Sequence, residues 1–147
     1  MFIKKRQDKN MTRLHERNYA KLFQTVPNIN HLSAGKLVHY RYDDNQIQIL
    51  VEEHTKYTSQ LNVSMRFKGN SHFLPKINIQ VRLYHDAKVA EVIDFQQKRR
   101  FHSRYPYPNP GMYQRNEKQQ INLFLADWLD HCIRQGIVIR HEEFLNS

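Results

Sequence analysis

One stretch of the sequence alternates basic with aromatic side chains and then becomes rich in proline. Residues 98–113 read KRRFHSRYPYPNPGMY. Nucleic-acid bases stack on aromatic rings while Lys and Arg neutralise phosphates, so this pattern is typical of single-stranded nucleic-acid binding. Prolines lower the conformational entropy that binding must remove from such a loop. We therefore predict that RNA or single-stranded DNA binds to Lys98, Arg99, Arg100, Phe101, Arg104, Tyr105 and Tyr107.

The distribution of charge also points to an anionic partner. The 147 residues carry 23 Lys and Arg against 14 Asp and Glu, a net charge of +9. Residues 1–26 and residues 96–118 each have a net charge of +5, so these two basic segments account for all of the excess. If they meet in the fold, their summed field attracts anions. Two alternatives stay open: an acidic protein as the partner, or solvated arginines beside tyrosines that pack over the edge of a sheet.

A histidine in a predicted turn is a second candidate for chemistry. His85 and Asp86 directly follow Arg82 and Tyr84, near the end of an alternating run. A turn can present an imidazole for acid–base chemistry, and a carboxylate can fix its tautomer. However, Asp is also a common turn residue, and the side chains of adjacent residues usually diverge. These four residues define a further alternative, a small hydrolase or ligand-binding domain around His85.

Other catalytic and metal chemistry has little support in the sequence. The nine histidines are scattered, and no pair has the i, i+4 spacing with a Glu that zinc hydrolysis requires. Cys132 is the single cysteine and lies on an apolar helical stripe, where a thiol is unreactive. The four glycines form no phosphate-binding loop. We therefore expect no metal, no cofactor and a binding function rather than catalysis.

The same composition bears on the compartment. No apolar run approaches the roughly 18 residues of a membrane helix, and the basic start of the chain is not followed by an apolar signal segment. A single cysteine excludes an intramolecular disulfide framework. We expect a cytoplasmic protein with no membrane partner.

Two predicted helices must position these residues. Apolar residues recur at helical spacing between residues 19 and 26, which predicts a helix from Met11 that ends before Pro27. A polar face of this helix carries three bases spaced by four: Arg13, Arg17 and Lys21. A longer apolar stripe over residues 121–133 predicts a second helix, with Asn116 as its cap and Gly136 as its stop.

Between the helices, the sequence has a period of two that predicts an antiparallel meander of about five strands. A hairpin centred on Asp44 and Asn45 would pair Tyr42 with Ile47. The connection at residues 85–88 predicts these further pairs: Leu83 with Ala90, Val81 with Val92, and Arg82 with Glu91. The last run also places Val89, Ile93 and Phe95 on the second face, which predicts that this face is covered in part.

The expected architecture is therefore an α+β domain over residues 11–140. The C-terminal helix packs on one face of the sheet, and the N-terminal helix lies on the opposite face or at an edge. Residues 137–139 are expected to add a short strand. A flexible basic arm (residues 1–10) and a polar tail (residues 141–147) flank the domain.

Motifs in the second half of the chain resemble a known family. They are VRLYHDA with VAEV in residues 81–92, RY and YPN in residues 104–109, QR and EK in residues 114–118, and QIN with FLADWL in residues 120–129. On these residues, the chain is similar over about residues 77–136 to the YqiB-like family of bacterial proteins, a domain of unknown function. The resemblance implies a bacterial cytoplasmic protein and supplies no activity, cofactor or site residue.

Overall fold

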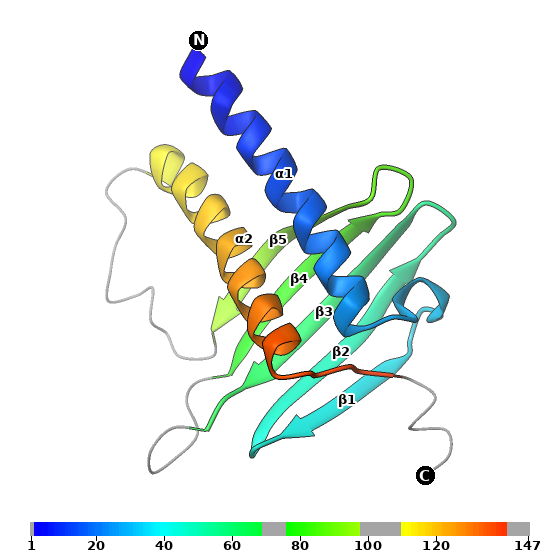
Figure 1. Ribbon diagram of the computed structural model, residues 1–147. Helices are drawn as coiled ribbons and strands as arrows, with labels where there is room; N and C mark the ends of the chain where they lie inside the picture. The colour runs from blue at the N-terminus through cyan, green and yellow to red at the C-terminus, as the bar shows by residue number, and fades with distance from the viewer. Residues whose placement is uncertain (1, 69–75, 98–109, 141–147) are drawn as a thin grey trace.

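The computed structural model has one antiparallel sheet with two helices on one of its faces (Figure 1). It describes residues 2–68, 76–97 and 110–140, with side chains for residues 11–68, 76–96 and 117–140. The elements in chain order are α1 (Phe2–Thr25), a 3-10 turn η1 (Ile29–His31), β1 (Leu37–Tyr42), β2 (Asn45–His54), β3 (Thr58–Arg66), β4 (Ile77–Tyr84), β5 (Val89–Gln97) and α2 (Pro110–Arg134). Strand order in the sheet follows chain order, which confirms the predicted α+β meander.

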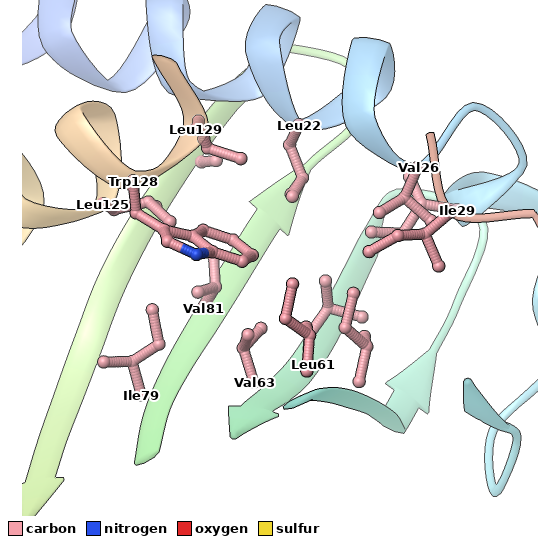
Figure 2. Close-up of a cluster of buried hydrophobic side chains, with 14 of the residues drawn as sticks. Leu22, Val26, Ile29, Leu61, Val63, Ile79, Val81, Leu125, Trp128 and Leu129 are labelled. Atoms are coloured by element: carbon pink, nitrogen blue, oxygen red, sulfur yellow. The ribbon is translucent and has the colours of Figure 1, made fainter. Parts of the chain in front are cut away.

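Both helices pack side by side on the same face of the sheet, so the prediction that α1 takes the opposite face or an edge was wrong. The physical reason is that most of the apolar surface of the sheet lies on one face. Alternate strand residues such as Val63 and Val81 are buried under the helices, whereas Asn62 and Gln80 on the other face are polar. Side chains from both helices, β3 and β4 meet in one cluster that contains Trp128 (Figure 2).

Both helices begin earlier than their apolar stripes predict. α1 begins at Phe2 rather than Met11, so the residues expected as a flexible arm are helical. α2 begins at Pro110 rather than at a cap on Asn116. Proline suits the first helical position, because the N–H that it lacks would have no partner there. Pro110 was therefore the stronger start signal.

The end of α2 follows the prediction, but the segment after it does not. Gly136 has a φ of +70°, and the N–H of Ile137 donates to the Cys132 carbonyl at 2.9 Å, as in a Schellman motif. Residues 137–140 are irregular rather than the expected strand. The N–H of Ile139 instead donates to the Thr25 carbonyl at 2.6 Å, which ties this segment to the end of α1.

The β1–β2 hairpin is displaced by two residues from its predicted register. Tyr40, not Tyr42, lies opposite Ile47. Asp43 and Asp44 are the two turn residues, with φ of +46° and +67°. Those values match the turn that suits the twist of a hairpin, and Asp tolerates them better than most residues. A two-residue displacement keeps the same side chains on the buried face, so the face prediction held while the register was wrong.

The β4–β5 pairing has the predicted register, with Leu83 opposite Ala90 and Val81 opposite Val92. Beyond that point, Ile93 is an extra residue in β5 and forms a bulge. Because a bulge reverses the alternation of side chains, Phe95 lies on the helix side, with its ring centroid 6.2 Å from that of Phe124. The prediction that Phe95 lies on the second face was therefore wrong.

The β4–β5 connection contains a strained residue and yields a stability prediction. Lys88 has a φ of +58°, a conformation that costs a side chain about 1 kcal/mol relative to glycine. Lys88→Gly is expected to raise the free energy of unfolding by about 0.5–1 kcal/mol in urea denaturation. Lys88→Ala is the control, because it removes the charge and keeps the Cβ atom. Equal stabilisation by both variants would contradict the strain argument.

Candidate nucleic-acid interface

A row of basic residues runs along α1. In this helix, which extends from Phe2 to Thr25, positions four residues apart are neighbours, and each is displaced by about 40° around the axis, so that they form a row that winds around the helix. Five such positions hold Lys or Arg, and we call them the basic row: Lys5, Lys9, Arg13, Arg17 and Lys21. At 1.5 Å per residue the row is about 24 Å long. Only Arg13, Arg17 and Lys21 could be placed on a helix from the sequence, because the predicted helix begins at Met11.

Two members of the basic row, Arg13 and Arg17, are exposed. The described residues give neither Arg13 nor Arg17 an ion-pair partner. Lys21, in contrast, forms an ion pair with Asp130 of α2, with 2.8 Å between Nζ and Oδ1. Like charges at i, i+4 destabilise a helix by about 0.2–0.5 kcal/mol per pair. A bound anion would relieve this repulsion between Arg13 and Arg17.

Two buried asparagines determine how α1 lies against α2. The side chains of Asn18 and Asn122 are fully buried. Asn18 Nδ2 donates to the backbone carbonyl of Asn122 at 3.1 Å. Asn122 Nδ2 donates to the Lys118 carbonyl at 2.8 Å, and its Oδ1 accepts the backbone N–H of Val92 at 2.9 Å. One side chain therefore fixes α2 to the outer edge of β5, next to α1.

These asparagines were not among the predicted site residues, although their positions in the sequence indicate that they are buried. Asn18 lies four residues before Leu22, and Asn122 three residues before Leu125, so both occupy the apolar stripes of their helices. A polar residue at a buried stripe position needs hydrogen-bond partners, because leaving it unpaired is costly.

The asparagine contacts bring the described parts of the two basic segments together. The helices run side by side with their first turns at the same end of the molecule (Figure 1). His15 of α1 lies near Lys118 of α2, whose Nζ is 2.7 Å from Glu91 Oε2. Burial lowers the pKa of His15, Lys118 acts in the same direction, and Glu91 opposes them. The first basic segment is thus a neighbour of the start of α2, where the second one ends.

The predicted nucleic-acid segment itself lies outside the described residues. This holds for all seven of its members, Lys98, Arg99, Arg100, Phe101, Arg104, Tyr105 and Tyr107. Their role stays a prediction.

The four residues around His85 do not converge on one pocket. Arg82 Nη2 donates to Gln60 Oε1 at 2.5 Å on the helix-free face, and strand alternation puts Tyr84 on that face too. His85 lies on the opposite face and contacts Tyr19 of α1. Asp86 is exposed in the connection. The arrangement separates the imidazole from the guanidinium.

Three further sequence-based expectations concern metals, the cysteine and membranes. In the part of the chain that the structure describes, no three His, Cys, Asp or Glu side chains gather closely enough to hold a metal ion. Cys132 is fully buried, and burial raises the pKa of its thiol to about 12, so the thiol is unreactive. Within the same described ranges, no helix has the length and apolar character needed to cross a membrane.

Comparison with known proteins places the chain in a family. Residues 21–138 match the family described as "Protein of unknown function (DUF1249)". The chain belongs to that family. It is also 42% identical over 127 residues to "Uncharacterized protein YqiB" of Escherichia coli K12, an alignment that covers 86% of this chain and 88% of YqiB. The YqiB proteins of Escherichia coli O6:H1 and O157:H7 give the same values.

These matches confirm the resemblance to the YqiB-like family and extend it beyond residues 77–136. No solved structure matches the chain. Four of the five residues of the basic row precede residue 21, where the family match begins. The basic row is therefore a feature of this sequence and of its helix α1, and most of it lies outside the region that matches the family.

Proposed function

We propose that this chain is a non-enzymatic binding module whose partner is anionic, and that the partner is RNA or single-stranded DNA. The observation that carries the proposal is the basic row of α1. Its charges repeat about every 6 Å along the helix, a spacing that suits a strand of phosphates better than one small anion. Arg13 and Arg17 neutralise phosphates. Both are exposed, and neither has an ion-pair partner among the described residues, which supports this role.

The preference for single strands comes from the aromatic residues of the second basic segment. Bases that are not paired can stack on Phe101, Tyr105 and Tyr107, whereas a duplex hides them. The parallel packing of α1 and α2 supports a shared surface, because it brings the basic row beside the start of α2. Such a partner fits the cytoplasm, which we propose as the compartment.

Binding is expected to depend steeply on salt. In anisotropy titrations with a labelled single-stranded RNA of about 20 nucleotides, phosphate contacts by the four members of the basic row other than the ion-paired Lys21 give a log–log slope of about −2.8. That slope corresponds to a loss of affinity of roughly 50-fold between 50 and 200 mM salt. An absence of binding at 50 mM salt would exclude the proposal. Equal affinity for a duplex of the same length would exclude the preference for single strands.

The double variant Arg13→Ala/Arg17→Ala tests the location of the interface. Removal of two of these four contacts should bring the slope to about −1.4, which is a loss of affinity of roughly sevenfold over the same salt range. Arg41→Ala/Arg66→Ala is the matched control, because it removes the same charge from two exposed residues on the helix-free face. Equal weakening by both pairs would mean that only net charge matters, and would contradict an interface on α1.

A protein partner is the second candidate, and the outer edge of β1 favours it. β1 is an end strand of the sheet, and within the described ranges no backbone group is bonded to its outer side. Leu37 at its start is 54% exposed. Such an edge can pair with a strand of another chain. In a pull-down from bacterial lysate, a partner retained after nuclease treatment favours this alternative, and release by nuclease favours nucleic acid.

A further inference from the structure

Four side chains form a hydrogen-bonded chain where α1 crosses the end of the sheet. Tyr19 Oη lies 3.0 Å from His85 Nδ1, and His85 Nε2 lies 2.7 Å from Ser59 Oγ. The same Ser59 Oγ lies 2.7 Å from His54 Nδ1. The four residues come from α1, the β4–β5 connection, β3 and β2, and we call them the histidine latch. They join three strand ends to the C-terminal part of α1.

Ser59 limits how many N–H groups can point at it from the two histidines of the latch. Its side chain is 1% exposed, and the described residues place no other hydrogen-bond partner on its hydroxyl. A hydroxyl has one proton, so Ser59 can donate to one imidazole only and must accept from the other. With both histidines neutral, all contacts are satisfied: Ser59 donates to His54, His85 donates to Ser59, and Tyr19 donates to His85.

One additional proton does not disturb this pattern. If His85 becomes an imidazolium, its Nε2–H still donates to Ser59, and its Nδ1–H donates to Tyr19 Oη. Ser59 still donates to His54. Each proton that points into the latch therefore has an acceptor, and Tyr19 changes from donor to acceptor.

A second proton breaks the pattern. Both imidazole rings then direct an N–H at Ser59 Oγ, and the hydroxyl proton of this buried residue loses its acceptor. Two positive rings also lie close together, edge to face, with their centroids 6.0 Å apart. Asp86 in the connection is the acidic group that acts on His85 from its own segment, and Tyr19 is the titratable group that contacts it from α1.

We propose that the histidine latch holds α1 on the end of the sheet with zero or one added proton and opens when both His54 and His85 are protonated. This property goes beyond anion binding, since none of the four residues belongs to the basic row. Its consequence is an acid-sensitive attachment of α1 in a fold whose remaining core, around Trp128, is apolar.

The direction of the pH dependence follows from the surroundings of His85. Burial lowers the pKa of His85 below its usual 6.5, His54 acts in the same direction, and Asp86 opposes them. Stability from such a group is fully present above pH 6.5 and is lost as the pH falls through the lower value in the folded protein. His15 has a lowered pKa for the same main reason, so the test must separate it from the latch.

Hydrogen exchange on the full chain tests the latch directly. Protection factors for the α1 amides of residues 19–25, corrected for intrinsic exchange, are expected to fall at least about tenfold from pH 7 to pH 5. The variant His54→Asn keeps a polar atom near the Nδ1 position, and its amide side chain takes up no proton. Its protection factors should fall by less than about threefold over the same pH range. His31→Asn changes an exposed histidine and should behave like the unmodified protein. An undiminished fall in His54→Asn would overturn the proposal, because a group other than His54 would then cause the effect.

The unmodified protein gives a second outcome that needs no variant. Protection of the α1 amides that does not change between pH 7 and pH 5 would overturn the proposal.

Discussion

Leu129→Ala is expected to lower the free energy of unfolding by about 2–5 kcal/mol. Leu129 is fully buried on α2 and belongs to the cluster that joins both helices to the sheet. The substitution removes apolar contacts and leaves a cavity that the packed helices and strands can fill only in part. Urea denaturation followed by far-ultraviolet circular dichroism measures the change.

Leu123 on the same helix provides the matched control. Its side chain is 44% exposed, so Leu123→Ala makes the same chemical change with little burial to lose. We expect Leu123→Ala to lower the free energy of unfolding by less than about 1 kcal/mol. If the two variants were equally destabilised, the assignment of Leu129 to the buried face of α2 would be wrong.

Asn122→Ala is expected to cost about 2–4 kcal/mol of unfolding free energy. The variant loses the hydrogen bond to the Lys118 carbonyl, and it leaves the backbone N–H of Val92 without the acceptor that the structure gives it. An unpaired buried donor costs more than a hydrogen bond gains, because its lost hydration is not replaced. Faster hydrogen exchange at the Val92 amide should accompany the loss of stability.

Asn62→Ala is the matched control for this prediction. Asn62 is half-buried on the helix-free face, where its Oδ1 accepts a long hydrogen bond of 3.4 Å from Ser64. The control should change stability by no more than about 0.5 kcal/mol. A loss at Asn122 no larger than this would contradict its role in fixing α2 to β5.

The strands could be predicted because, in an antiparallel sheet with one face exposed to solvent, apolar and polar residues alternate along each strand. The register of β4 with β5 was also predictable, since one connection length opposed apolar to apolar and Arg82 to Glu91. The β1–β2 register was not, because two pairings displaced by two residues bury the same face. The choice between them depended on the left-handed backbone of Asp43 and Asp44.

Bulges and helix starts escaped prediction for different reasons. The bulge at Ile93 is a backbone irregularity with no marker such as Gly, and it moved Phe95 onto the helix side. The start of α1 was predicted too late because its first turns extend beyond the sheet and have no apolar stripe to reveal them. Tertiary packing, rather than local pattern, decides such positions.

The candidate site was predictable only in part. Charge counting identified both basic segments, but their proximity depends on contacts between residues about 100 positions apart, such as Asn18 with Asn122. The histidine latch is similar: strand alternation places Ser59 and His85 on the buried side, yet only the tertiary structure brings them to Tyr19.

The pairing of the first helix with the last one has a consequence for biosynthesis. Asn18 and the backbone of Asn122, its partner, are separated by 104 residues. At about 5–20 residues per second, a ribosome needs roughly 5–20 s to make that interval. During this time, the apolar side of the emerging α1 lacks both α2 and the complete sheet. The nascent chain therefore exposes Leu22 and Val26 until α2 has been made, and during that time it is open to capture by chaperones.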